Sequence, residues 1–399
     1  MPHLVSTITG AEYPFERLEE FAGNGESLEV RLPENRLPHL RSGSHLAERF
    51  REFLPFRSPD LNLSLGEGNT PLVRAEGPLA EITGIRNLFL KNETQNPTWS
   101  FKDRGSLPCV WMARERGEDV LATISTGNMG HSIAAYAARA GMRAIVFVPE
   151  FATREKLAAM SIHGALIVRV HAPDYSVMKR RILDLAGRMG LRIVSGNGPV
   201  RVEGYKLTAF EIFEQMGGSV PEYVAVPTSA CGHCRGLFKG FRELRQAGLT
   251  QDLPKMIVVQ AANNAPIVTG ITRGLDHVVP FSNVQTVAEA ITTGNPPGGD
   301  EIVRKAKEYG WPAMAVTEEE ILDGQRLMAR SGYFVEPAAA TTLHAVRKLV
   351  ERGTLAPEAS VVLMLTGSGL KDLDALRHHE TRVIDTGIDE VEERLASLL

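Results

Sequence analysis

Cysteine is scarce in this chain: Cys109, Cys231 and Cys234 are the only three among 399 residues. So few cysteines cannot build a disulfide framework, which indicates a reducing compartment, and the cytoplasm fits best. The first ten residues lack the basic segment and apolar run of a secretory signal, and no stretch of about 18 predominantly apolar residues occurs. We therefore expect a cytoplasmic protein that is neither secreted nor inserted in a membrane.

An excess of charge of one sign is also missing. The chain has 44 lysines and arginines against 48 aspartates and glutamates, a formal charge of −4, which argues against nucleic acid as a partner. We find no internal repeat with a period of about 20 to 50 residues, and this argues against solenoids and propellers. The content of hydrophobic residues, 43%, is that of a globular chain with a large core. The length predicts two or three domains, or two lobes that share a cleft.

The order of apolar segments predicts the fold class. Residues 1–60 contain several prolines and many charges, and we expect them to form an irregular extension around the main body. After them, short runs that are apolar almost throughout alternate with amphipathic segments of helical period. This alternation predicts an α/β protein with parallel sheets flanked by helices, in two lobes. The predicted strands cover 87–91, 120–126, 144–149, 165–170, 191–194, 223–228, 256–260 and 361–365, and the predicted helices include 154–162, 175–189, 203–216, 237–247, 318–331 and 338–351.

Ligands of α/β folds bind at the carboxyl ends of the strands, so the turns between strands and helices are the candidate sites. The first turn leads to Lys102, just after the expected start of a helix at Ser100. A lysine held there can be partly desolvated, which lowers its pKa and suits it to Schiff-base and proton-transfer chemistry. Alternatively, Lys102 is an ordinary surface lysine.

Three further turns have small residues and hydroxyls. Ser125, Thr126 and Gly127 precede a helix whose N-terminal amides could bind a carboxylate or a phosphate, although they could equally be simple helix caps. The turn from Pro227 to Gly236 could bring amides around a phosphate. The turn from Leu365 to Asp372 offers a hydroxyl to a heterocyclic nitrogen, or is merely a glycine-rich turn.

Taken together, these turns resemble those of the threonine synthase family, within the fold type II pyridoxal-phosphate enzymes related to the tryptophan synthase β subunit. The resemblance runs from about Leu61 to Asp372 in the family's order. It rests on several motifs, namely SLGEGNTPL at 64–72, NPT at 96–98, SFKDRG at 100–105, STGN at 125–128, RVEG at 201–204, FVEPA at 334–338 and LTG at 365–367.

The resemblance implies roles for individual residues and a two-lobed architecture with pyridoxal 5'-phosphate in the cleft. Lys102 would carry the cofactor and act as the base, Asn128 would contact its phenolic oxygen, and Thr366 would face its pyridine nitrogen. A neutral pyridine facing a hydroxyl favours elimination or replacement over transamination. Arg201 and the turn Ser125, Thr126 and Gly127 would bind an anionic amino acid. The phosphate of the cofactor would lie in the loop formed by Ser229, Ala230, Cys231, Gly232 and His233.

The chain departs from the family pattern at three places near this cleft. Trp99 stands where the family usually has glycine, and its indole could narrow the cleft. The family's asparagine at position 230 helps to bind the substrate phosphate, whereas the methyl group of Ala230 cannot. Gly196 replaces a serine that the family often has. These departures keep related reactions open beside threonine synthesis.

We interpret the cysteine-free N-terminal segment, the Cys231–Cys234 pair, and His131 and Glu336 as structural features. Residues 1–60 contain no cysteine, which excludes the zinc ribbon found in many relatives, and we expect no metal site. Cys231 and Cys234 have the spacing of a redox motif, and with His131 they could be read as a metal site, but we interpret the loop as shaped by small residues. We interpret His131 as a cap or cleft wall, and Glu336 as the residue that starts a helix.

The resulting function hypothesis is a pyridoxal-phosphate lyase that converts phosphohomoserine and water to threonine and phosphate. The alternatives are a β-replacement enzyme or a serine/threonine dehydratase, and, from another class, a non-catalytic amino-acid sensor. We expect the protein to form a homodimer and to bind a small anionic amino acid as its substrate. The expected domains are the extension 1–60, a large cofactor domain of 61–105 and 205–385, a small mobile substrate domain of 106–204 and a tail of 386–399.

Overall fold

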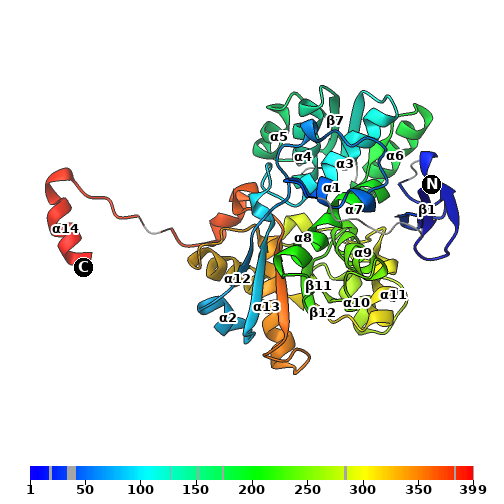
Figure 1. Cartoon of the computed structure of the whole chain (residues 1–399). Helices are drawn as coiled ribbons and strands as arrows, with labels where there is room; N and C mark the ends of the chain where they lie inside the picture. The colour runs from blue at the N-terminus through cyan, green and yellow to red at the C-terminus, as the bar shows by residue number, and fades with distance from the viewer. Residues whose placement is uncertain are drawn as a thin grey trace.

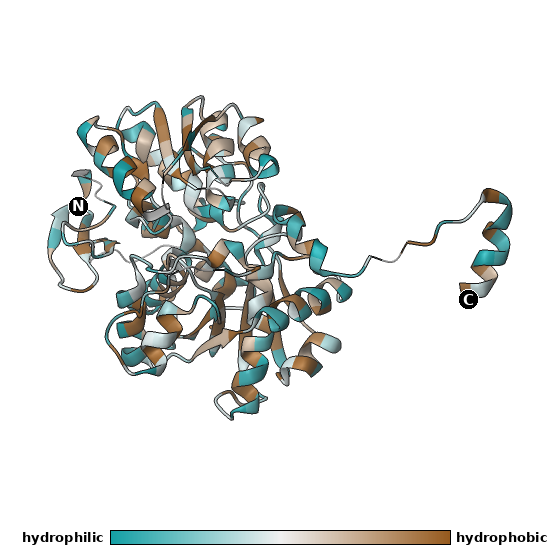
Figure 2. Ribbon diagram, turned by 180° about the vertical axis from the view of Figure 1, so that it is seen from behind, coloured by the Kyte–Doolittle hydropathy of each residue, from teal (hydrophilic) through white to brown (hydrophobic). Residues whose placement is uncertain are grey.

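The computed structural model describes residues 1–17, 20–33, 42–125, 127–150, 152–172, 175–282, 285–381 and 383–398. Two sheets, each with helices packed against it, form two lobes that lie one above the other in Figure 1. Hydrophobic residues gather on the strands and on the inner faces of the helices, as Figure 2 shows. Within the described residues, no helix is long and apolar enough to cross a membrane.

The larger lobe is built on a six-stranded sheet in the order β12-β11-β10-β13-β5-β4. Five strands are parallel, and β4 at the edge is antiparallel to β5. Side chains along the inner strands alternate between two cores: Val224 and Val226 face one, and Ala225 faces the other. Both faces are buried, which is why these strands are apolar almost throughout. The strands are β4 (Leu72–Arg74), β5 (Asn87–Asn92), β10 (Tyr223–Pro227), β11 (Lys255–Ala261), β12 (Ala313–Val316) and β13 (Ser360–Leu365).

Seven helices of the larger lobe flank this sheet in the described part of the chain. Helices α2, α12 and α13 pack on one another and α13 covers β10, β11, β12 and β13, while α9 and α10 pack against β11. The bounds are α2 (Pro78–Thr83), α8 (Leu207–Gln215), α9 (Gly232–Gln246), α10 (Pro266–Thr272), α11 (Gly299–Tyr309), α12 (Glu318–Arg330) and α13 (Pro337–Glu351).

The smaller lobe is built on a four-stranded parallel sheet in the order β8-β7-β6-β9. Helices α3 and α4 pack against each other and against β6, and α7 packs on α3, so this group joins the two lobes. The strands are β6 (Val120–Ile124), β7 (Arg143–Pro149), β8 (Leu166–Val170) and β9 (Ile193–Val194), and the helices are α3 (Lys102–Glu115), α4 (Asn128–Arg139), α5 (Arg154–Ser161), α6 (Tyr175–Arg188) and α7 (Pro199–Tyr205).

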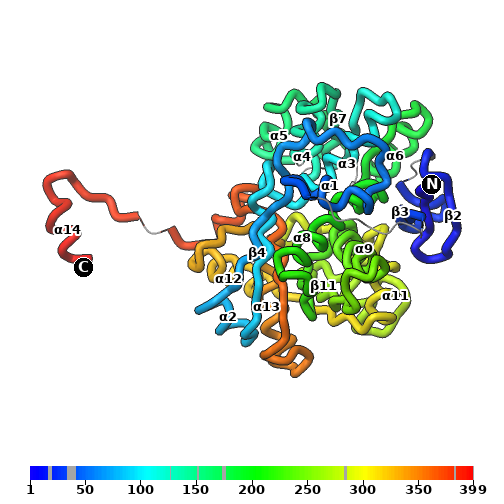
Figure 3. The backbone as a smooth tube through the Cα atoms, viewed as in Figure 1, coloured from blue at the N-terminus to red at the C-terminus, as the bar shows by residue number. Residues whose placement is uncertain are grey.

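The first sixty residues are more regular than the sequence suggests. Strands β1 (His3–Ser6), β2 (Glu12–Pro14) and β3 (Leu28–Arg31) form an antiparallel sheet, which lies at one side of the molecule in Figure 3. The carbonyls of Leu28 and Val30 accept hydrogen bonds from Arg235 and Lys239 of α9. Strands of three or four residues carry little periodic signal, which explains why the expectation of an irregular extension was wrong.

Two other details differ from the predicted elements. The single helix expected over 203–216 is divided at Lys206 into α7 and α8. Helix α1 (Leu46–Arg49) precedes the sheets of the two lobes in the chain, and α14 (Val391–Leu398) lies apart from both lobes (Figure 3). The boundaries of the four expected domains stay a prediction.

Candidate active site

Lys102 is placed at the first position of α3 by backbone pairing with the turn that follows β13. The amide of Phe101 donates to the carbonyl of Thr366 at 3.0 Å, and the amide of Ser368 donates to the carbonyl of Trp99 at 3.0 Å. A second segment pairs with the same turn, since the amide of Glu336 donates to the carbonyl of Gly367. Three segments distant in sequence therefore meet at the carboxyl end of the larger sheet.

The amine of Lys102 is buried and lies 4.2 Å from the centroid of the Phe101 ring. The pKa of Lys102 is lowered from 10.5 to about 7: burial is the largest cause, the Arg201 charge adds to the shift, and the Glu336 charge opposes it. A large share of the amine is thus neutral near pH 7 and available as a nucleophile or base. The neighbouring acid, Asp103, accepts hydrogen bonds from the amide and the hydroxyl of Thr98, both at 2.6 Å, which fixes the turn before the helix.

The second predicted turn lies at the start of α4. The hydroxyl of Ser125 accepts hydrogen bonds from the amides of Gly127 and Gly130, at 3.3 and 3.2 Å. Asn128 is the first residue of the helix and is 9% exposed. Thr126 lies outside the described residues. These bonds are consistent with the interpretation of Ser125 as a helix cap. Substrate binding at this turn stays a prediction.

The third predicted turn connects β10 to α9 and reaches the smaller lobe. Cys231 has φ +73° and precedes the helix, which begins at Gly232. A Cβ on Gly232 would lie 2.3 Å from the carbonyl oxygen of Gly196, so only glycine allows this approach of the two loops. The hydroxyl of Ser229 donates to Thr293 at 2.8 Å, while Ala230 is half-buried. The three thiols of the chain are buried and not joined in disulfides.

Thr366 and Asn128 share a buried carboxylate. The Thr366 hydroxyl donates to Oε1 of Glu336 at 3.1 Å, and Nδ2 of Asn128 donates to Oε2 at 2.8 Å. A Cβ on Gly367 would lie 2.7 Å from this carboxylate, which therefore needs a glycine beside it. Glu336 is the N-cap residue of α13, as expected, but its side chain does not cap the helix. From the sequence we expected Glu336 only to start a helix, and its contacts with Thr366 and Asn128 were not predicted.

Comparison with known proteins gives this arrangement a family. The family model of pyridoxal-phosphate dependent enzymes matches residues 63–367, which include Lys102, Asn128 and Thr366. The chain belongs to the pyridoxal-phosphate dependent enzymes. Curated relatives named threonine synthase include one from Methanocaldococcus jannaschii, 39% identical over 82% of this chain and 81% of that protein, and one from Mycobacterium tuberculosis, 36% identical over 86% and 92%.

Solved structures of pyridoxal-phosphate enzymes share the fold. Threonine deaminase isoform 2 from Solanum lycopersicum is similar with a TM-score of 0.68 and 21% identity, covering 87% of this chain and 96% of that one. An L-serine ammonia-lyase from Rhizomucor miehei has a TM-score of 0.65 and 21% identity, covering 79% and 99%. The predicted family, the α/β fold of fold type II and the predicted cofactor are thereby confirmed.

The residues present fit pyridoxal phosphate. His233 is 5% exposed, both its ring nitrogens lack a hydrogen-bond partner within the described residues, and its ring stacks on Phe101 at 3.9 Å. Burial lowers the pKa of His233 to about 3, so the ring is neutral. The buried hydroxyl of Ser100, next to Lys102, is likewise without a partner there. Because most buried polar atoms have a hydrogen-bond partner, these three atoms beside Lys102 are available to contact the cofactor.

Arg201 lies in the same region but is wholly buried. Its guanidinium donates to the carbonyl of Lys102 at 3.0 Å, to the hydroxyl of Tyr205 at 3.0 Å and to that of Ser106 at 3.4 Å. These bonds tie α7 to the start of α3. Contact between Arg201 and the substrate stays a prediction. Any such contact would be made by a side chain that also joins α7 to α3.

Trp99 occupies a backbone conformation that explains the usual glycine of the family. Its φ is +64°, and the residue is 46% exposed. An L-residue in this region costs about 1 to 2 kcal/mol relative to glycine. We therefore expect Trp99→Gly to raise the free energy of unfolding by about 1 kcal/mol, measured by urea denaturation of the holoenzyme. An unchanged or lower stability would mean that packing of the indole outweighs the strain.

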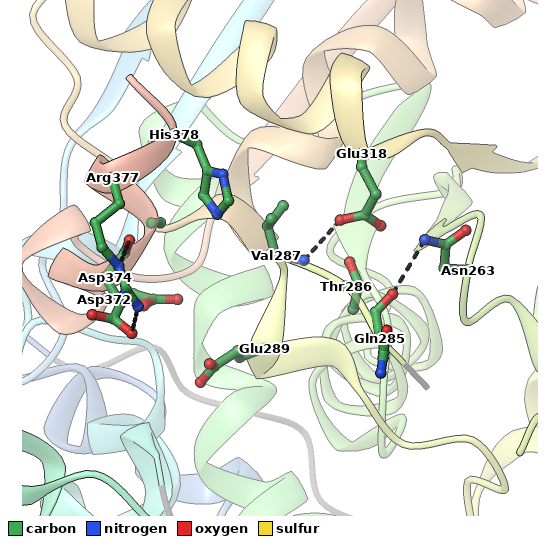
Figure 4. Close-up of a pocket in the computed structure, with 11 residues that line it drawn as sticks. Asn263, Gln285, Thr286, Val287, Glu289, Glu318, Asp372, Asp374, Arg377 and His378 are labelled. Atoms are coloured by element: carbon green, nitrogen blue, oxygen red, sulfur yellow. Dashed lines mark hydrogen bonds and ion pairs between the residues drawn. The ribbon is translucent and has the colours of Figure 1, made fainter. Parts of the chain in front are cut away.

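A basic cluster and a cavity lie beside the site. Lys371 contacts Nδ1 of His131, whose Nε2 lies 3.2 Å from Nε2 of His163. The next residue, Asp372, lines a cavity of about 390 Å³ (Figure 4). The cavity contains none of the predicted site residues and has four carboxylates, so it is poorly suited to an anion. The carboxylates belong to Glu289, Glu318, Asp372 and Asp374. Within the described residues, no group of three or more His, Cys, Asp or Glu side chains could hold a metal ion.

Proposed function

We propose that the chain is a threonine synthase, a lyase that converts O-phospho-L-homoserine and water to L-threonine and phosphate. The observation that carries this proposal is the similarity to curated threonine synthases over more than four-fifths of the chain, at up to 39% identity. The buried amine of Lys102 supports it, because the reaction needs a base beside the cofactor.

The chain's residues have distinct tasks in this reaction. Pyridoxal phosphate, when bound, supplies an electron sink that stabilises negative charge next to the substrate's Cα. Lys102 is the group that takes up and returns protons at Cα and Cβ, since its amine is neutral in part near pH 7. Phosphate leaves from Cγ, and water adds at Cβ. The loop from Ser229 to His233 at the start of α9 would hold the cofactor phosphate with its amides.

The second candidate is a dehydratase or β-replacement reaction on an amino acid of similar size. Ala230 and Gly196 favour it, because neither side chain can donate a hydrogen bond to a substrate phosphate. Release of inorganic phosphate from phosphohomoserine, measured beside release of ammonia from serine and threonine, separates the two. Phosphate release with threonine as product supports the synthase, whereas ammonia release alone would replace it by the dehydratase.

Substitution of Arg201 tests how the substrate's far end is bound. We expect Arg201→Ala to raise the KM for phosphohomoserine by at least about 10-fold, since a hydrogen bond to a charged group contributes about 1.5 to 3 kcal/mol. The same change should leave the KM for serine or threonine almost unchanged. Because Arg201 also joins α7 to Lys102, the thermal midpoint is measured in parallel. Equal losses for both kinds of substrate would show a structural role only.

Three further statements belong to this proposal. The partner is a small anionic amino acid, the chain forms a homodimer, and the enzyme works in the cytoplasm. The scarcity of cysteine supports the compartment. Sedimentation of the holoenzyme at several concentrations would test the dimer.

A further inference from the structure

Glu336 is a buried acid of the site whose predicted role, the start of a helix, does not involve the cofactor. It is 3% exposed, and its two carboxylate oxygens accept one hydrogen bond from Thr366 and one from Asn128. Since the side chain makes no bond to the helix that it begins, capping does not account for its burial. A buried carboxylate held by two residues of the cofactor site has a place in the chemistry of that site.

The number of protons on Thr366 decides what this contact does. A threonine hydroxyl has one proton to donate. While Glu336 is ionised, Thr366 donates that proton to Oε1, and its oxygen can only accept a hydrogen bond from the cofactor side. When Glu336 is protonated, the carboxyl donates to the Thr366 oxygen, and the threonine proton is free for another acceptor.

The group expected on the other side of Thr366 is the ring nitrogen of the cofactor. We propose that Glu336, acting through the hydroxyl of Thr366, sets whether this ring nitrogen carries a proton. One proton is shared: if Glu336 gives its proton to Thr366, Thr366 passes its own to the nitrogen, and the carboxyl becomes a carboxylate. Glu336 is thus a positioning residue. The inference rests on the cofactor of the family and on the predicted place of Thr366, not on the identity of the substrate.

The surroundings of Glu336 act in opposite directions on its protonation. Burial raises the pKa of the Glu336 carboxyl, while the bonds from Asn128 and Thr366 and the charges of Lys371 and Lys102 oppose this shift. Lys102 comes from α3 and Lys371 from the turn after β13. Asp372, beside Lys371, is itself affected by the Glu336 charge. The carboxyl is thus subject to the charges of two amines and influences one further acid.

The test is the protonation of the ring nitrogen in the holoenzyme without substrate. Nitrogen-15-labelled pyridoxal phosphate is bound, and the resonance of its ring nitrogen is followed from about pH 6 to about pH 9. In wild type we expect this resonance to move with pH. In Glu336→Gln, which keeps the shape but cannot ionise, we expect the movement to be lost or its midpoint to shift by at least about 1 pH unit.

Two more variants keep the test decisive. Thr366→Val breaks the connection and leaves Glu336 in place, so it should change the resonance as Glu336→Gln does, and it decides the matter if the glutamine variant does not hold the cofactor. Thr208→Val is the matched control, because Thr208 is buried in α8, its hydroxyl has no hydrogen-bond partner in the part of the chain that the structure describes, and it lies outside the site. It should leave the resonance unchanged.

The proposal would be overturned if the resonance and its pH dependence were the same in wild type, in the control and in whichever of the two site variants binds the cofactor. Because no substrate is present, this result does not depend on whether the enzyme makes threonine. A failed synthase assay with an altered ring resonance would leave the role of Glu336 standing.

Discussion

Replacing Lys102 by alanine is expected to abolish the visible absorbance of the bound cofactor and to lower turnover by at least about 1,000-fold, because one side chain supplies both the covalent link and the base. The protein should stay folded. Within the described residues, the Lys102 amine has no hydrogen bond and no ion pair. It lies over the face of the Phe101 ring. Its removal therefore leaves no buried partner unpaired.

Two controls make this expectation specific. Lys102→Met keeps the length and the apolar stem but has no amine, so it should be as inactive as the alanine variant. Lys102→Ala leaves space where a small amine can bind, and added methylamine should restore part of the turnover in this variant only. Turnover and the absorbance spectrum are the measurements. A borohydride-reducible adduct that persists in Lys102→Ala would assign the link to another lysine.

The pH dependence of cofactor attachment gives an independent check of the environment of Lys102. Its pKa in the folded protein is lowered to about 7 by burial, so the neutral amine increases as pH rises through 7. The rate of attachment to the apoprotein should rise up to about pH 8 and then level off. A rate that continues to rise toward pH 10, as for an exposed lysine, would contradict the burial of this amine.

The positions of the strands could be predicted because the central strands are buried on both faces and read as continuous apolar runs. β10, β11 and β13 show this, each lying within one or two residues of the predicted range. The edge strand β4, with three residues, and β12, an Ala-Met-Ala-Val segment, give no comparable signal. The helix expected over 203–216 was periodic throughout, and only tertiary packing divides it at Lys206.

The site divides in the same way. Lys102 and the small residues of the turns could be predicted, because the types of residue needed at strand ends are local. The place of Glu336 could not, since it is set by backbone pairing between two segments some thirty residues apart in sequence, and locally its sequence reads as the start of a helix. The three internal hydrogen bonds of Arg201 could not be predicted either, because two of the acceptors lie on α3, about a hundred residues away in sequence.

The glycine of the RVEG motif is where the structure predicts the largest effect on stability. A Cβ on Gly204 would lie 1.9 Å from the carbonyl oxygen of Arg104 and 2.9 Å from Pro108. Proline has no amide proton, so Pro108 leaves that carbonyl without its helical hydrogen bond, and the bare backbone of Gly204 can pack against it. Neither contact is with the end of a flexible side chain. The two helices can accept a methyl group only by separating.

We therefore expect Gly204→Ala to lower the free energy of unfolding by at least about 3 kcal/mol, or to prevent folding, because both helix backbones must shift. Since α3 begins at Lys102, the variant should also bind the cofactor more weakly. Gly187→Ala is the control: Gly187 lies in α6 with nothing within 4 Å of its added Cβ, and alanine there should stabilise the protein by up to about 1 kcal/mol. Urea denaturation and cofactor titration are the measurements. A Gly204→Ala variant within about 0.5 kcal/mol of wild type would mean that α3 and α7 do not approach each other this closely, and with that the positioning of Lys102 by α7 would have to be abandoned.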